Sequence, residues 1–165
     1  MKGPDKVLFA IVAGIVILVG ITLAIVFLRP KPGYLPDDTP EGVTHNYLLA
    51  LQRREYERAY GYLSSSVVGY PESLQAFTRD VEDHSWEVRG LQGGSASFEI
   101  QSSQVSGDSA TVSVRETTFY QGGVFGSSQE TTYFDVHLRR ADNAWKIYRA
   151  GGFWVWCWDR PEGCQ

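Results

Sequence analysis

The two cysteines of this chain lie seven positions apart near its C-terminus, as Cys157 and Cys164. Such a pair can form a redox centre, part of a zinc site or a structural disulfide. The spacing is not that of a CxxC redox pair, and two thiols alone are too few ligands for zinc. Pro161 and Gly163 favour a turn between them. We therefore expect a structural disulfide that closes a loop of eight residues.

A histidine near the middle of the chain follows a run of carboxylates. His84 comes after Asp80, Glu82 and Asp83. Histidine and carboxylates together can ligate a metal ion. The same run is typical of a solvated helix end, where a histidine interacts favourably with the C-terminal carbonyls. We prefer the helix end and expect no metal.

Asp135 and His137 lie two positions apart in an alternating segment, where they could pair as a base and its orienting partner. Alternation places them on the face opposite the apolar residues of the segment, which favours solvated strand positions. The inward positions carry no titratable side chain until Glu116 and Arg140. We therefore expect no catalytic residues, no cofactor and no enzyme activity.

The net charge of -4, with acidic and basic residues intermixed, is a poor match to a nucleic-acid-binding protein. Residues 7–28 contain no charge and would form a helix roughly 33 Å long, enough to cross a bilayer. A cleaved secretory signal has a shorter apolar core and a small-x-small cleavage site, whereas "RPKPG" follows here. We expect an uncleaved single-pass signal-anchor.

The flanking charges give little information on orientation, because Lys2 and Lys6 precede the span while Arg29 and Lys31 follow it. The expected disulfide does give information on orientation, since disulfides persist outside the cytosol. We therefore place residues 1–6 in the cytoplasm and the rest of the chain beyond residue 28 outside, in the periplasm or at the cell surface.

The small residues of the span gather on one face of the helix. At 100° per residue, five of them fall within an arc of about 120°, namely Ala10, Ala13, Gly14, Gly20 and Ala24. Such a face lets a second helix approach closely, from another subunit or from another copy of the chain. The alternative is chance, because glycine and alanine are common in membrane helices.

Residues 29–39 are proline-rich and predict a semi-rigid linker, so that the folded domain would occupy residues 40–165. Three helices are expected first: one that begins at Thr39-Pro40-Glu41, one over 56–64, and one started by Pro71. Period-two alternation then predicts four strands. They cover 95–105, 110–120, 131–140 and 144–156, with a glycine-rich loop at 122–129 and a short strand near 86–92. The layout indicates an α+β fold with three helices on one face of a curved antiparallel sheet.

Three segments carry a family resemblance: "THNYLLALQRREYERAYGYLSS", "SLQAFTRDV" and "NAWKIYRAG". They resemble the helices and the closing strand of the nuclear-transport-factor-2-like (NTF2-like, or cystatin-like) superfamily. The layout is similar to its membrane-anchored, non-enzymatic members in type IV secretion systems and mycobacterial lipid-import complexes. That resemblance implies assembly work within a membrane complex.

Three functions therefore compete. The first is an accessory or assembly subunit that works through protein–protein contacts. The second is a binder of a small apolar ligand in the cone between helices and sheet, lined by tyrosines, namely Tyr47, Tyr56, Tyr60, Tyr62 and Tyr70. The third, an isomerase or cyclase, would need a carboxylate or histidine inside the cone.

The tail "FWVWCWDRPEGCQ" is rich in tryptophan. Its period-two pattern predicts a strand with Trp154, Trp156 and Trp158 on one face, after a bend or bulge at Gly151-Gly152. That face would be a lid over the open end of the cone, a partner-protein surface or an anchor at the membrane interface.

Overall fold

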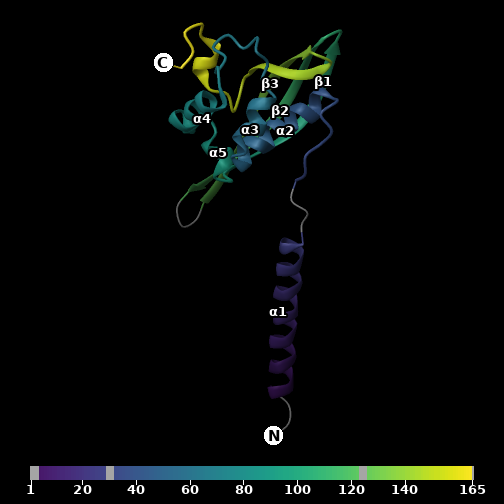
Figure 1. The fold of residues 1–165 in the computed structure, drawn as a ribbon. Helices are drawn as coiled ribbons and strands as arrows, with labels where there is room; N and C mark the ends of the chain where they lie inside the picture. Colours follow the sequence, from purple (N-terminus) through teal and green to yellow (C-terminus); the bar gives the residue numbers. More distant parts are fainter. Residues whose placement is uncertain (1–3, 29–31, 123–125, 165) are drawn as a thin grey trace. The chain divides into compact units, whose positions relative to one another are not determined.

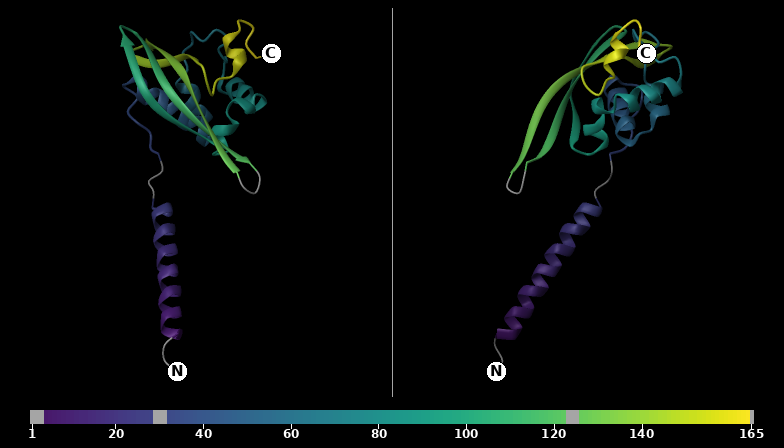
Figure 2. Two further views of the ribbon diagram at one scale, coloured as in Figure 1. Left: turned by 180° about the vertical axis from the view of Figure 1, so that it is seen from behind. Right: turned by 90° about the vertical axis from the view of Figure 1, so that its left-hand side faces the viewer.

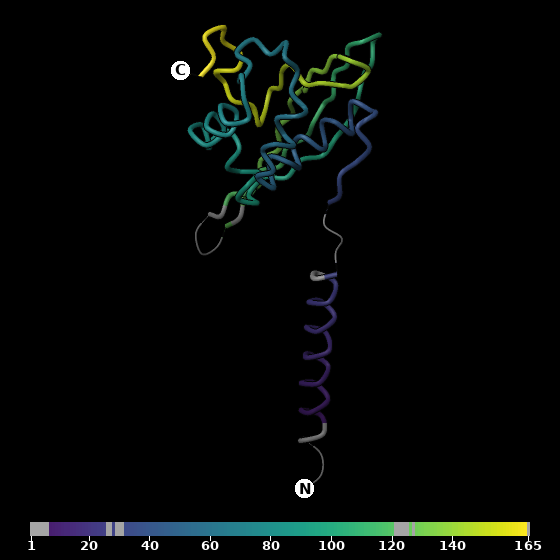
Figure 3. The backbone as a smooth tube through the Cα atoms, in the orientation of Figure 1, coloured from purple at the N-terminus to yellow at the C-terminus, as the bar shows by residue number. Residues whose placement is uncertain are grey.

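The computed structural model describes residues 4–28, 32–122 and 126–164. The chain divides into two compact units, Met1–Gly33 and Tyr34–Gln165, and each is described here by itself (Figure 3). The first unit contains one helix, α1 (Pro4–Phe27). Its stretch Val7–Ile25 has a mean hydropathy of 3.0 and no part of it is buried. By length and composition α1 can cross a membrane, and the crossing itself stays a prediction.

The second unit begins with a helical layer. It comprises α2 (Pro40–Arg53), α3 (Tyr56–Gly61), α4 (Leu74–Asp83), a 3-10 turn (Ser85–Glu87) and α5 (Arg89–Gln92). The predicted start of α2 is confirmed: the Thr39 hydroxyl accepts a hydrogen bond from the Gly42 N–H at 3.1 Å, and Pro40 is the first helical residue. This cap satisfies a backbone donor that the helix itself leaves free.

Two predictions for this helical part of the chain need correction. Helix α4 begins at Leu74 and not at Pro71, because the Ser73 hydroxyl accepts from the Ala76 N–H at 3.1 Å and so caps the helix. The short strand expected near 86–92 is wrong, since this segment is helical. Its buried residues are Val88 and Leu91, and their spacing of three is that of a helix.

The sheet follows, in the antiparallel order β1-β2-β3-β4. Its strands are β1 (Ala96–Ser106), β2 (Ser109–Gly122), β3 (Gly126–Ala141) and β4 (Ala144–Ala150). The strands curve, and the helices cover one face of the sheet (Figures 1 and 2). The predicted α+β class is therefore confirmed. The glycine-rich loop is shorter than expected, because β3 already begins at Gly126.

The predicted alternation along the strands is confirmed by burial. Val136 and Leu138 of β3 are fully buried, whereas Asp135 on the other face is exposed. The segment after α3 then covers the free edge of β4. The Ile147 N–H donates to the Tyr62 carbonyl at 2.9 Å, and the Ile147 carbonyl accepts from the Ser64 N–H at 2.7 Å.

The domain begins earlier than the predicted boundary at residue 40. The side-chain amide of Asn46 donates to the Leu35 carbonyl at 2.7 Å, and the Leu35 N–H donates to Asn46 Oδ1 at 2.8 Å. The Tyr34 hydroxyl donates to Glu55 at 2.6 Å. Tyr34, Leu35 and Asp37 of the expected linker are therefore hydrogen-bonded to the domain, although residues 35–39 are exposed.

The tail departs most from its prediction. β4 ends at Ala150, and the chain turns away at Gly151 and Gly152. A Cβ on Gly152 would lie 2.8 Å from the Phe134 ring, so only glycine fits at this turn. Phe153 then takes a positive φ of 52°. The glycine break is as predicted, but the strand expected to continue through residue 156 is wrong.

Trp154, Trp156 and Trp158 consequently do not share an exposed face. Trp154 is 4% exposed and Trp158 is 1% exposed, whereas Trp156 is 42% exposed. The last part of the tail is a 3-10 helix (Trp156–Asp159). A partner surface made of all three side chains is ruled out by this burial, and of the three only Trp156 is available to a partner.

Candidate functional site: a histidine facing a disulfide

The C-terminal segment Trp156–Cys164, which we call the clasp, is closed by the expected disulfide between Cys157 and Cys164, whose Cα atoms lie 5.1 Å apart. Gly69, from the loop before α4, packs against it and donates its N–H to the Trp158 carbonyl at 2.8 Å. A Cβ at Gly69 would lie 2.7 Å from the Cys157 carbonyl oxygen. The clasp is therefore fitted closely to this loop.

Trp158 anchors the clasp in the core. Its ring stacks on Phe77 of α4, with centroids 5.2 Å apart, and meets Trp154 edge-on at 5.0 Å. Its Nε1–H donates to Asp80 Oδ2 at 3.0 Å. Because Asp80 is only 4% exposed, this bond satisfies both a buried donor and a buried carboxylate.

Several aromatic side chains are part of the buried core of the domain. Tyr47 is fully buried, lies 6.5 Å from Trp154 by ring centroids, and donates its hydroxyl to the Phe153 carbonyl at 3.2 Å. Burial raises the pKa of Tyr47 far above its ordinary value. Trp154 and Trp158 of the tail therefore belong to the buried core of the domain.

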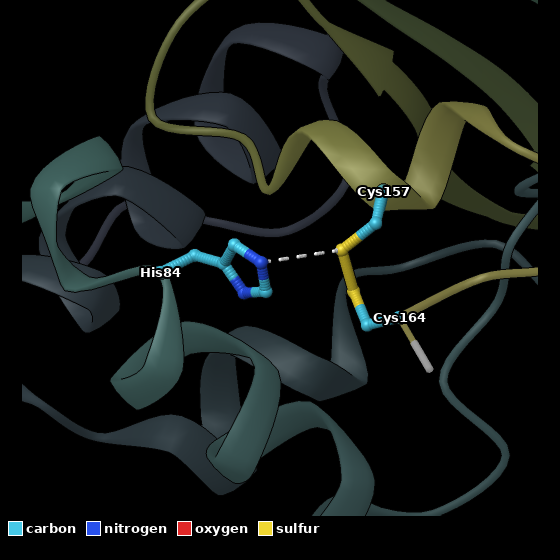
Figure 4. A group of neighbouring side chains, drawn as sticks. All are labelled: His84, Cys157 and Cys164. Atoms are coloured by element: carbon cyan, nitrogen blue, oxygen red, sulfur yellow. Dashed lines mark hydrogen bonds between the residues drawn. A yellow bond between two sulfur atoms is a disulfide. The ribbon is translucent and has the colours of Figure 1, made fainter.

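His84 lies at the end of α4 and faces the disulfide (Figure 4). Its Nδ1 is 2.9 Å from the Asp80 carbonyl oxygen, and its Nε2 is 4.0 Å from Cys157 Sγ. A carbonyl oxygen can only accept, so Nδ1 carries a hydrogen, and Nε2 is the ring nitrogen that faces the sulfur. Trp86 and Trp156 meet the imidazole ring edge-on at 5.0 and 5.8 Å.

The carboxylates considered from the sequence as metal ligands beside His84 do not form a site with it. The carboxylate of Asp80 binds Trp158, and Glu82 and Asp83 are exposed. The structure instead brings His84 to Cys157 and Cys164, so that Nε2 and the two Sγ atoms all lie within 4.8 Å of one another. No local spacing signals this group, because 73 residues separate His84 from Cys157.

Two pockets adjoin the clasp. One, of about 670 Å³, lies between the clasp and residues 65–80. The other, of about 330 Å³, is lined by Arg79, Asp80, Asp83, His84 and Cys164. The second pocket therefore gives solvent and small ions access to the histidine and to one of the two sulfurs.

The other sequence candidates lie elsewhere in the chain. His137 Nδ1 is 3.2 Å from the Thr111 hydroxyl on the outer face of the sheet. The carboxylate of Glu116 accepts from Thr118 at 3.1 Å. The five small residues of the predicted helix-packing face all belong to α1, and that face remains a prediction.

No family model matches the sequence, and neither does any curated protein. Among solved structures, an NTF2-like protein with a cystatin-like fold from Novosphingobium aromaticivorans is 16% identical, with a TM-score of 0.46 over 67% of this chain and 75% of that one. An NTF2-like protein of unknown function from Shewanella oneidensis is 13% identical, with a TM-score of 0.45 over 66% and 90%. The intermembrane-space region of the chloroplast protein ARC6 is 14% identical, with a TM-score of 0.37 over 74% and 98%.

The order of the elements is the decisive observation for the fold. Helices come first and cover one face of a curved antiparallel sheet in the order β1-β2-β3-β4. The domain has an α+β fold. The NTF2-like resemblance noted in the sequence agrees with this α+β layout, while membership of the superfamily and the membrane-anchored, non-enzymatic type stay predictions. The fold alone assigns no activity, ligand or partner.

Proposed function

We propose that this chain is an accessory or assembly subunit of a membrane protein complex. In this proposal α1 is a single transmembrane anchor, the N-terminus is cytoplasmic, and the NTF2-like domain lies outside and acts through protein–protein contacts. The observation that carries the proposal is the filled interior: Tyr47, Phe77 and Trp158 are among the largest fully buried side chains. A domain whose cone is occupied by its own core works through its outer surface.

An aromatic patch at the clasp supports this role. We use that name for Trp86, Trp156 and Arg160. The two indoles are 57% and 42% exposed, and the Arg160 guanidinium lies 4.1 Å from the Trp156 ring centroid. Tryptophan and arginine are the side chains most enriched at the energetic centres of protein interfaces. The partner surface proposed for the tail therefore centres on Trp156.

The anchor supplies a second contact. Gly14 and Gly20 leave open space on α1, because no other atom lies within 4 Å of a Cβ built on either. Under the proposal this side of α1 packs on a helix of another subunit or of a second copy. The alternative functions gain less support, since Tyr47, Phe77 and Trp158 belong to the buried core of the domain.

The test uses the full chain, extracted from its own membrane in mild detergent. We expect native mass spectrometry to give a mass larger than that of one chain, because the chain stays bound in its complex. Trp156→Ala and Gly14→Leu should each reduce the fraction in the complex. Val105→Ala, at a 57% exposed position of β1, and Val19→Leu, on the far side of α1, are the matched controls. A chain that migrates as a free monomer would overturn the proposal.

A further inference from the structure

We infer that reduction of the disulfide converts the clasp into a binding site for one zinc ion, with His84, Cys157 and Cys164 as its protein ligands. The inference is independent of the proposed assembly role. Two thiolates and one imidazole form a common zinc ligand set, in which water or another group takes the fourth tetrahedral position. The three ligand atoms already lie within 4.8 Å of one another.

The orientation of the histidine is the strongest argument. Ligating histidines generally donate their second ring N–H to a carbonyl or carboxylate, which fixes the tautomer and aims the free nitrogen at the metal. His84 has this arrangement, because Nδ1 donates to the Asp80 carbonyl at 2.9 Å while Nε2 faces Cys157 Sγ. The bond from Nδ1 fixes the imidazole ring, so that Nε2 is already directed at the sulfur.

The distances fit a tetrahedral centre after a small movement. With Zn–S near 2.3 Å and Zn–N near 2.0 Å, a tetrahedron places the two sulfurs about 3.8 Å apart and the nitrogen about 3.5 Å from each sulfur. The Nε2 atom is now 4.0 Å from Cys157 Sγ. Once the S–S bond is broken, rotation of the Cys164 side chain can supply the remaining separation.

Access and charge also favour the site. Cys164 is half-buried and lines the 330 Å³ pocket together with His84, so a reductant, the ion and a coordinating water can enter there. Cys157 is 2% exposed. Zn²⁺ with two thiolates and a neutral imidazole has no net charge, which limits the cost of holding it in this partly buried position.

An external dithiol can serve as the reductant of the Cys157–Cys164 disulfide. The dithiol transfers two electrons and two protons to the S–S bond, giving two protein thiols, and itself becomes a disulfide. Zn²⁺ then displaces the two thiol protons, which pass to solvent, and both sulfurs bind as thiolates.

The test uses the full chain in detergent, stripped of metal by a chelator that is then removed, with a phosphine as reductant and Co²⁺ as the spectroscopic probe. The reduced chain should bind one Co²⁺, with thiolate-to-cobalt charge-transfer bands and tetrahedral d–d bands that Zn²⁺ abolishes. The oxidised chain should show neither band. A reduced chain without the thiolate bands, or equal binding by both forms, would overturn the inference.

Variants identify the ligands. His84→Asn retains a donor for the Asp80 carbonyl but lacks Nε2, and it should weaken Co²⁺ binding at least about tenfold. Cys164→Ser should abolish the two-thiolate spectrum. His137→Ala, on the outer face of the sheet, should leave affinity unchanged. Far-UV circular dichroism checks that each variant is folded, and a folded His84→Asn chain with unchanged affinity would remove His84 from the site.

Discussion

Gly69 is a residue whose replacement should loosen the clasp directly. A Cβ at this position would lie 2.7 Å from the Cys157 carbonyl oxygen and 2.8 Å from Gly163 Cα, both of them backbone atoms that cannot swing away. We expect Gly69→Ala to lower the free energy of unfolding by about 1–3 kcal/mol, the usual cost of overpacking.

The measurement is urea unfolding of the full chain followed by tryptophan fluorescence. Gly61→Ala is the matched control, because nothing lies within 4 Å of a Cβ at Gly61, and it should leave stability unchanged or slightly raised. Equal effects of the two substitutions would show that Gly69 is not tightly enclosed.

Tyr70 gives the domain a dependence on alkaline pH. Burial, together with a hydrogen bond to Tyr60, raises the pKa of Tyr70 from 10.0 to about 12. A raised folded-state pKa favours the protonated form, so this contribution to stability is complete below pH 10 and is lost as pH rises to about 12. Wild-type stability should therefore fall more than that of Tyr70→Phe over this interval. Difference absorbance of tyrosinate between the two proteins measures the pKa, and a Tyr70 that titrates at its ordinary value would contradict the expectation.

At the scale of elements, α2 depends on the segment that leads into it. Asn46 is fully buried, and the partners of its side chain lie in Tyr34–Thr39, as does the N-cap of α2. We expect residues 34–165 to fold as an independent unit. Residues 40–165 should be less stable by about 2–4 kcal/mol, because they lack the cap and leave a buried amide unpaired.

The two truncations are compared by urea unfolding in the same buffer, so that the six residues between them are the sole difference. Asn46→Ala in residues 34–165 is the control for the amide. This substitution should reproduce part of the loss of stability, because it removes the buried amide but keeps the N-cap at Thr39. Equal stability of the two truncations would mean that residues 34–39 do act as a free linker.

Elements whose signals are local could be predicted from the sequence. The start of α2 needs only Thr39, Pro40 and the helix they begin, and each strand shows its own alternation. The tail could not be predicted in this way. Alternating aromatic residues look the same in a strand and in a chain that leaves the sheet, and the deciding contact is a close approach of Gly152 to Phe134.

The candidate site was predictable only in part. The disulfide follows from two nearby cysteines, but its histidine comes from the end of α4, 73 residues earlier. Trp158 helps to bring these segments together, because its ring packs between Phe77 and Trp154 and its Nε1–H donates to Asp80. The contact between His84 and the disulfide forms only when the core is complete. The residue spacing within α4 or within the clasp therefore does not predict it.

At the scale of the whole molecule, the proposed topology makes a prediction about thiols. If residues 34–165 lie outside the cytosol, the disulfide between Cys157 and Cys164 persists there. A membrane-impermeant maleimide added to intact cells should then add no mass to the chain before reduction and two labels after reduction with an impermeant phosphine. Labels that require lysis would place the domain in the cytosol. Cys157→Ser, which frees Cys164 in either compartment, is the positive control for access.

The pairing of Asn46 with Leu35 has a mechanical consequence. Tension transmitted along the chain from residues 1–33 would reach the domain at Tyr34 and Leu35. The two hydrogen bonds between Leu35 and Asn46, at 2.7 and 2.8 Å, then share that load side by side and have to break together. One residue earlier in the chain, the Tyr34 ring lies against the Arg58 guanidinium, whose Cζ is 3.4 Å from the ring centroid. We therefore expect Tyr34 and Leu35 to bear a force that pulls on α1, so that α2 stays in contact with the sheet until the two bonds to Asn46 break.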